Sequence, residues 1–433
     1  MLERPLSAPP GWRQFLADLN PTVAANGLIG LIFSATGPVA IVLSVGTHGG
    51  LSEAQMASWL FGAFALNGLL SILMCWRYRQ PLVCFWTIPG TVLIGPALGH
   101  LTFPEVMGAC YASGLLMLVL GLSGGVRRVM SAVPMPIVMG MVAGVFLRFG
   151  LDLVRSLHDN LAIAGPMVAT WLLLCAVPAW GRRVPPILGA LIVGALAIYL
   201  SGQGGGMSLG GSHAVFVRPV FETPVWSWPA MVELLVPLVV TSLIVQNGQG
   251  IAALKAAGHE PPINAVSVAC GIGTLLSAAV GCACTCLAGP SNAIITSSGR
   301  RGSHYAGGIC CAVLAIAFGV LSPVFTRLLL HTPIAFIMAL AGLAMLRVLQ
   351  GAFTTAFRTR FSLGALVAFL VTVADLGIAN IGAAFWGLVA GFVVSWLLER
   401  QDFRALADEL AAQRMQGAAQ AGATPSGSVR GST

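Results

Sequence analysis

Apolar stretches long enough to cross a bilayer recur along the whole chain, and this feature restricts its fold more than any other. A membrane-spanning helix needs about 20 mostly apolar residues. By that measure the sequence contains fourteen candidates, some of them short or interrupted. They lie near residues 22–44, 54–76, 81–98, 104–122, 129–151, 164–180, 185–201, 230–254, 263–280, 283–298, 304–325, 331–350, 361–376 and 380–398.

The composition leads to the same class of protein. Only 8% of the residues are charged and 57% are apolar, with a mean hydropathy of +0.89. A water-facing surface usually requires about a quarter of the residues to be charged. The net charge of +8 arises from basic residues scattered between the apolar stretches, which argues against a nucleic-acid partner. We therefore predict an all-α integral membrane protein in contact with the lipid bilayer.

The basic residues also predict an orientation, because loops on the cytoplasmic side of a membrane are enriched in Lys and Arg. If the N-terminus is cytoplasmic, the loops after even-numbered spans should be basic. Only four of the 22 basic residues, Arg148, Arg155, Arg218 and Arg327, then fall on the outer side. A miscounted span would disturb this pattern. We expect fourteen spans, with both termini cytoplasmic.

Two halves of the chain resemble each other at one fixed offset. The segment beginning at Pro136 is similar to the segment beginning at Pro333, and both copies end in an arginine. Gly90 and Pro290, in the third and tenth stretches, are 200 residues apart. A repeat with an odd number of spans must insert its second copy upside down, as in many secondary transporters. The sequence thus predicts two inverted seven-helix repeats.

This repeat divides the chain into five parts. We expect a cytoplasmic N-terminal segment, a first seven-helix repeat, an extracytoplasmic loop, a second inverted repeat and a partly disordered cytoplasmic tail. Their ranges are 1–21, 22–201, 202–229, 230–400 and 401–433.

The third and tenth stretches are predicted to be discontinuous. Each has an extended-looking half, then a proline–glycine pair (Pro89-Gly90 and Gly289-Pro290), then a short helix. Proline favours the first turn of a helix. A helix start exposes unpaired N–H groups and about half a positive charge. Two such starts, facing each other at the bilayer midplane, would bind an anion without a lysine or arginine.

The residue types around these helix starts predict the substrate contacts. We expect N–H groups and side-chain donors for a carboxylate from Gly90, Thr91, Ser291 and Asn292, with Thr87 capping the first half-helix. The eighth stretch adds two amides, Gln246 and Asn247, which suit either the site or contacts between helices. The first stretch and the residues before Pro89 contribute further polar and aromatic candidates, which suit either a flat aromatic ligand or ordinary packing: Phe33, Ser34, Thr36, Phe85 and Trp86.

Other chemistries find little support in the sequence. Cys282, Cys284 and Cys286 alternate along one face of the tenth stretch, but their spacing is not that of a zinc site. We interpret them as packing residues and expect neither a metal nor a cofactor. The sequence contains no phosphate-binding loop, catalytic triad signature or HExxH motif. It therefore predicts a protein that is not an enzyme.

The segment 245–263, VQNGQGIAALKAAGHEPPI, together with the two proline–glycine entries, resembles the benzoate:proton symporter family of BenE type. The similarity extends from about residue 15 to about residue 400. It implies proton-driven uptake of an aromatic carboxylate across a bacterial inner membrane. It also implies a fold related to nucleobase–ascorbate and sulfate-type transporters, with core and gate domains and a ligand between the third and tenth spans. Dimers are common among those relatives, so a homodimer is an expectation.

One departure from these relatives concerns charge. Nucleobase carriers of similar fold place carboxylates in the eighth and tenth spans, where this chain has Gln246 and either Ser291 or Asn292. Neutral side chains suit an anionic substrate, because a fixed carboxylate would repel it. The proton carrier is not identified. Acidic residues near the outer ends of spans and histidines near helix ends are interpreted as solvated groups: Glu105, Asp152, Glu233, Asp375, His100, His259, His304 and His331.

The sequence therefore predicts a symporter that imports benzoate or a similar aromatic carboxylate with protons by alternating access. Two alternatives stay open at this point. One is a carrier of the same fold for a nucleobase or an inorganic anion, and the other is an anion channel.

Overall fold

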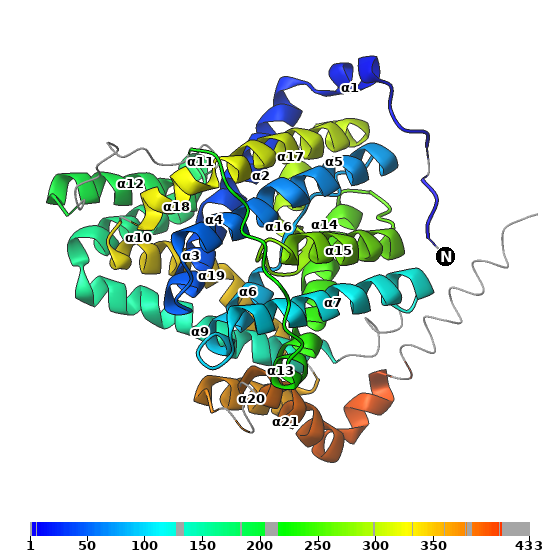
Figure 1. The fold of residues 1–433 in the computed structure, drawn as a ribbon, viewed down its shortest axis with the longest axis vertical. Coiled ribbons are helices and arrows are strands. Elements are labelled where there is room, and N and C mark those ends of the chain that lie inside the picture. The colour runs from blue at the N-terminus through cyan, green and yellow to red at the C-terminus, as the bar shows by residue number, and fades with distance from the viewer. Residues whose placement is uncertain are drawn as a thin grey trace, which may run out of the picture.

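The structure is a computed structural model, and it describes residues 2–5, 7–126, 134–181, 184–203, 215–297, 299–330, 332–358, 360–376, 378, 383–406 and 408. Some residues used above lie outside these ranges, among them His331 and most of the tail. The molecule is a bundle of helices with one small sheet (Figure 1).

All fourteen predicted stretches contain a helix. The first half of the chain has α1 (Trp12–Asp18), α2 (Pro21–Ala35), α3 (Gly37–His48), α4 (Glu53–Phe61), η1 (Gly62–Leu66), α5 (Asn67–Tyr78), β1 (Cys84–Trp86), α6 (Ile88–Ala97), α7 (Phe103–Ser123), α9 (Met135–Asp159), α10 (Leu161–Ala176), α11 (Pro178–Gly181) and α12 (Pro186–Ser201). The second half has α13 (Trp228–Val239), η2 (Val240–Gln246), α14 (Asn247–Ala256), α15 (Ile263–Ala278), β2 (Thr285–Leu287), α16 (Gly289–Ile295), η3 (Arg301–Ser303), α17 (His304–Val320), α18 (Ser322–Leu330), α19 (Ile334–Phe357), α20 (Ser362–Ala374) and α21 (Ala383–Leu398).

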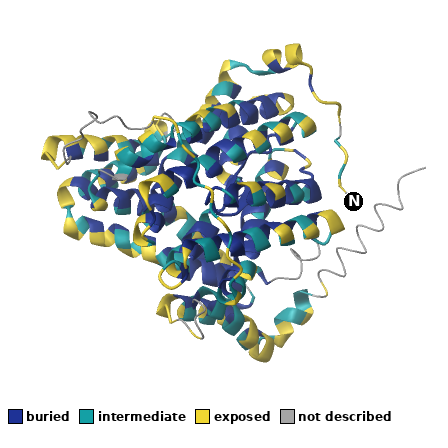
Figure 2. Ribbon diagram, in the orientation of Figure 1, coloured by how far each residue is buried: buried dark blue, intermediate teal, exposed yellow. Residues whose placement is uncertain are grey.

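Among the described residues, seven helices or continuous helix runs are long and apolar enough to cross a bilayer. The count is eight if the bent pair formed by Ala383–Leu398 and Arg400–Leu406 is one span. Five further apolar helices are shorter, including α6 and α15. The chain is thus a multi-pass membrane protein. Large apolar side chains remain exposed around the bundle, among them Leu73, Leu196 and Trp396, whereas the centre of the bundle is buried (Figure 2). A soluble protein could not leave so many such side chains in water.

The two halves place matching elements at nearly constant offsets. α6 and α16 start at Ile88 and Gly289, α7 and α17 at Phe103 and His304, and α9 and α19 at Met135 and Ile334. The first and eighth stretches are both irregular at their centres. In the first, Thr36 has φ −92° and ψ −93° and separates α2 from α3. In the eighth, the π-helix η2 occupies the corresponding place. This break in the first stretch was not predicted.

The helices form two groups. A central group consists of α2–α7 and α13–α17, in which α7 packs on α15 and α17 packs on α2 and α5. A flanking group consists of α9–α12 and α19–α21, in which α9 packs on α19 and α20. The groups meet where α3 contacts α19, α6 contacts α9 and α13 contacts α21. These contacts place the first half-helix, α6, at the boundary between the groups.

Helices of the flanking group approach closely through glycine. A Cβ atom added at Gly140 of α9 would lie 2.3 Å from the backbone oxygen of Ala365 of α20. We predict that Gly140→Ala lowers stability by about 1–3 kcal/mol, because the backbones must separate. Gly351→Ala on α19 is the control, since a Cβ there meets nothing within 4 Å. Thermal unfolding of both variants in detergent measures the difference, and equal midpoints would contradict the prediction.

Candidate functional site

Two short strands, β1 and β2, pair at the centre of the bundle, and each leads into a half-helix. We call this antiparallel pair the crossed strands. β1 and β2 pair antiparallel, with Phe85 opposite Cys286. Beyond the strands, Thr87 N–H donates to the Cys284 oxygen (2.7 Å) and Ala288 N–H donates to the Val83 oxygen (3.0 Å). Because the strands run in opposite directions, α6 and α16 leave the sheet in opposite directions. The predicted strand-and-half-helix form of the third and tenth stretches is confirmed.

Hydroxyl groups from two neighbouring helices hold the outer edges of these strands. Ser71 Oγ of α5 accepts from Cys84 N–H (2.8 Å), and Thr274 Oγ1 of α15 accepts from Thr285 N–H (2.9 Å). The two bonds occupy matching positions in the two halves of the chain. A strand edge in the bilayer core must be satisfied by protein, because no water is there to replace the partner. Neither Ser71 nor Thr274 was among the predicted site residues, although both are polar residues within apolar stretches.

Asn247 and Asn292 complete this support. Asn292 Oδ1 accepts from Val83 N–H (3.0 Å), and its Nδ2 donates to the oxygens of Val83 and Ala288 (both 2.9 Å). Asn247 Oδ1 accepts from Leu287 N–H (2.6 Å). Both residues were candidates for binding substrate, and Asn247 also for contacts between helices. In the structure both amides hold the strands, a role that had not been assigned to Asn292.

The start of α6 is capped as predicted. Thr87 Oγ1 accepts from Gly90 N–H (3.2 Å), while Thr91 N–H and Oγ1 both donate to the Thr87 oxygen. The Gly90 N–H is therefore engaged by the cap, contrary to the expectation that it is available to a ligand. A substrate at this helix start would compete with Thr87 or bind through the remaining dipole.

The first stretch reaches the start of α16 through one hydrogen bond. Ser34 Oγ and Ser291 Oγ are 2.8 Å apart and buried, and Ser34 Oγ also contacts the Gly30 oxygen. Thr36 Oγ1, at the break after α2, donates to the Phe33 oxygen (3.2 Å). Two of the predicted site residues are thus in direct contact although they are 257 positions apart.

Phe85 and Trp86 pack inside the central group. The Phe64 ring of η1 lies 5.4 Å from Phe85 and 4.9 Å from Trp86, and 4.6 Å from Phe318 of α17. Phe85 and Trp86 thus contact other aromatic side chains of the central group. The Trp86 indole N–H is buried without a hydrogen-bond partner among the described residues, which leaves one donor within this cluster.

The π-helix η2 presents polar groups without partners beside α6. Gln246 is buried, and no hydrogen bond of its side chain exists among the described residues. The Ser242 hydroxyl is likewise buried and unpaired in the described part of the chain. Thr241 lines a narrow gap together with residues of α6 and α9, which are Pro89, Leu93, Met141, Val142, Val145 and Phe146. π-Helical turns often mark functional sites. The gap adjoins both α6 and the flanking group.

No lysine or arginine of the described residues is buried. Any anion at the crossed strands must therefore be held by helix starts, hydroxyls and amides. Cys282, Cys284 and Cys286 are all buried, in keeping with their interpretation as packing residues. The described residues contain no group of three metal-binding side chains.

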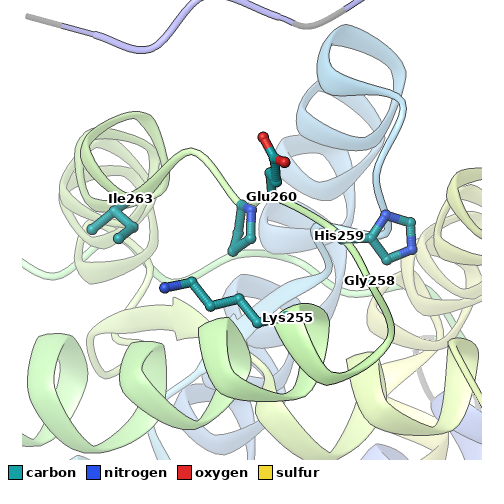
Figure 3. Close-up of a pocket in the computed structure, with 6 residues that line it drawn as sticks. Lys255, Gly258, His259, Glu260 and Ile263 are labelled. Atoms are coloured by element: carbon teal, nitrogen blue, oxygen red, sulfur yellow. The ribbon is translucent and has the colours of Figure 1, made fainter. Parts of the chain in front are cut away.

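Two histidines interpreted as surface groups are in fact buried. His259, in the loop after α14, and His304, at the start of α17, are joined through Nε2 and Nδ1 at 3.0 Å. His259 also borders an open hollow of about 650 Å³ with Lys255, Glu260 and Ile263 (Figure 3). Burial, then His304 and Arg301, lowers the pKa of His259 to about 4. Both were predicted to be solvated because histidine is polar. Tertiary packing buries them instead.

Comparisons with known proteins agree with this architecture. The family model described as "Benzoate membrane transport protein" matches residues 17–397. The chain is 30% identical over 385 residues to an Escherichia coli inner membrane protein, YdcO, covering 87% of this chain and 96% of that one. It is 26% identical over 388 residues to a benzoate membrane transport protein of Acinetobacter baylyi, covering 88% of this chain and 95% of that one.

Solved structures share the fold at low sequence identity. The transmembrane domain of a cyanobacterial bicarbonate transporter, BicA, superimposes with a TM-score of 0.58 at 17% identity, covering 89% of this chain and 99% of that one. The murine anion transporter Slc26a9, in an inward-facing state, gives a TM-score of 0.55 at 13% identity, covering 92% and 74%.

The strand supports generate a stability prediction. Ser71→Ala and Thr274→Val each remove the acceptor for a buried strand N–H, which costs about 1–3 kcal/mol. Ser113→Ala is the matched control, because Ser113 is buried but bonds only the Ala109 oxygen of its own helix. Thermal unfolding should show two destabilised variants and a control close to wild type. If Ser113→Ala is as unstable as the other two variants, hydrogen bonds to the strand N–H groups contribute no more to stability than a bond within a helix.

His259 generates a pH prediction. Its lowered pKa means that the unfolded chain binds a proton at higher pH than the folded chain does. This contribution to stability is present above about pH 6.5 and is lost as the pH falls toward 4. His259→Gln should therefore flatten the fall of the melting temperature between these values, whereas His48→Gln, at an exposed histidine, should not. If the melting temperatures of wild type and His259→Gln fall equally with pH, His259 is not the source of this pH dependence.

The family model matches most of the chain. The two solved structures that share its fold are described as a bicarbonate transporter and an anion transporter. The chain belongs to the BenE family of benzoate membrane transport proteins and is a membrane transporter rather than an enzyme.

Proposed function

We propose that this protein is a secondary transporter that imports benzoate or a similar aromatic carboxylate together with protons. The observation that carries the proposal is the pair of half-helices that start from crossed strands, in a bundle whose described residues bury no lysine or arginine. Helix starts bind anions through N–H groups and the helix dipole. The family match and the Acinetobacter baylyi relative support the aromatic carboxylate as substrate.

The proposed site lies between α6, η2, α16 and the broken first stretch. We expect the carboxylate near Thr87, Gly90, Thr91 and the Ser34–Ser291 pair. The unpaired Gln246 amide is also available to it. Phe33, which is half-buried, and the apolar side chains of the narrow gap would contact the ring. The two strand-holding asparagines keep this arrangement in place rather than contact the ligand.

Transport would proceed by alternating access. The gap between α6 and α9 is too narrow to admit a water molecule, so the flanking group must separate from the central group before a ring can enter. This motion fits two inverted repeats of seven spans, because an inverted pair has two equivalent arrangements that open to opposite sides. The offsets between matching helices support fourteen spans. A bacterial inner membrane, cytoplasmic termini and a homodimer stay predictions.

Counterflow in proteoliposomes tests this function. Vesicles loaded with unlabelled benzoate should take up labelled benzoate from outside, beyond the passive entry seen in protein-free vesicles. Competition by uracil, sulfate or bicarbonate, but not by benzoate, would indicate a different substrate of the same fold. A conductance far above carrier turnover would indicate a channel.

Gln246→Glu tests the site within the same assay. A buried carboxylate beside the substrate would repel it, so counterflow of benzoate should fall by at least about tenfold, since a close like charge costs more than 1.4 kcal/mol. Gln249→Glu is the control, because Gln249 lies on the adjoining helix turn but is exposed. Unchanged counterflow in Gln246→Glu, with normal thermal stability, would place the substrate elsewhere.

A further inference from the structure

One buried carboxylate has no role in the site described so far. Glu233 of α13 is 5% exposed and is the only buried acidic side chain among the described residues. Its Oε2 lies 2.8 Å from Nε2 of His100, whose side chain is 30% exposed. Both residues were predicted to be solvated, which is wrong for Glu233. A carboxylate is retained in such a position at a cost, so a function is the default expectation.

The pair joins the two elements that form the substrate site. His100 follows α6 directly, so it lies at the far end of the first half-helix. Glu233 lies on α13, which continues into η2 with Thr241, Ser242 and Gln246. α13 and α6 also pack against each other. A change of charge at this pair therefore acts on both elements. By the predicted topology, the pair lies near the outer face.

We infer that Glu233 is the group that binds the co-transported proton, and that His100 delivers the proton from the outer solution. This inference rests on the proposed proton-coupled uptake of a carboxylate. The partly exposed imidazole takes a proton on Nδ1 from water. The Nε2–H bond then breaks as its proton forms an O–H bond with Glu233 Oε2, and His100 returns to a neutral tautomer. No electron is transferred and no other reactant is needed. Histidine is suited to this step because it exchanges protons near neutral pH.

Protonation of Glu233 would favour binding of an anion at the crossed strands. Glu233 lies eight residues before Thr241, which corresponds to roughly 12 Å along a helix. At that distance and an effective dielectric constant of about 20, one unit of like charge changes the affinity for an anion by roughly tenfold. Proton and substrate thus promote each other's binding, since coupling between two sites is reciprocal. Such mutual promotion is the requirement for symport.

Few other charges face the pair. Glu105 of α7 interacts electrostatically with His100 while it caps its own helix through Thr102. No other titratable residue is joined to His100 or Glu233 by a hydrogen bond or ion pair within the described ranges. The remaining acidic, basic and histidine residues on the helices that pack against α6 and α13 are His48 on α3 and, on α9, Arg148, Asp152, Arg155, His158 and Asp159.

The test separates coupling from transport in full-length protein. Wild type, Glu233→Gln and His100→Gln are reconstituted, with Asp375→Asn as the control at an exposed carboxylate of the flanking group. Two rates are measured with labelled benzoate at outer pH 6.5 or above: counterflow at equal pH, and accumulation driven by an inward proton gradient. Protein-free vesicles correct for entry of neutral benzoic acid. Calorimetry in buffers of different ionisation enthalpy counts the protons taken up on benzoate binding.

We expect Glu233→Gln to retain counterflow but to lose gradient-driven accumulation, with proton uptake falling from about one per benzoate toward none. The benzoate affinity of this variant should be independent of pH, whereas the wild-type affinity should fall roughly tenfold when Glu233 loses its proton. His100→Gln should slow accumulation, while Asp375→Asn should match wild type.

Three results would overturn the inference. The first is gradient-driven accumulation of benzoate by Glu233→Gln, and the second is a wild-type proton count in this variant. The third is loss of counterflow together with accumulation in both pair variants, which would make the pair a structural link between α6 and α13. Absence of benzoate counterflow in wild type itself would instead refute the proposed function, so the two failures are distinguishable.

Discussion

The antiparallel contact between β1 and β2 is the constraint on which the rest of the structure depends. Backbone that is not helical is tolerated at membrane depth only if protein satisfies every N–H and C=O group. Here each strand pairs with the other on one edge, and side chains from α5, α14, α15 and α16 bind the other groups. This requirement explains why polar residues occur within apolar helices around the crossing. It also fixes where α6 and α16 begin, and therefore where positive dipole ends can meet an anion.

Much of the architecture was predictable because it follows from length, hydropathy and backbone chemistry. Proline and glycine marked the starts of both half-helices, and Thr87 marked the cap of α6. Hydropathy located all fourteen helical stretches. The break at Thr36 and the π-helices were not foreseen. Gly37-Pro38, just after the break, is the signal that could have revealed the break in the first stretch.

The site was predicted less completely, because sequence shows which polar residues are present but not what they bind. Asn292 and Ser291 are neighbours, yet Asn292 holds a strand and Ser291 contacts Ser34. Phe85 and Trp86 adjoin the site, but Phe64, distant in sequence, occupies the space beside their rings. Glu233 and His259 were misjudged for a related reason. Their burial depends on partners, His100 and His304, that lie 133 and 45 positions away.

Side chains from four helices of the central group hydrogen-bond to the crossed strands. These bonds have a consequence for the turnover rate of such a protein. A pocket formed by loops could open through local fluctuation. A pocket formed by clamped strands cannot, because loosening one strand exposes unpaired amides to hydrocarbon. Under the proposed alternating access, the smallest moving part would be the whole central group, which slides against the flanking group. The turnover rate would accordingly be governed by the thickness and fluidity of the surrounding membrane as much as by the affinity for the cargo.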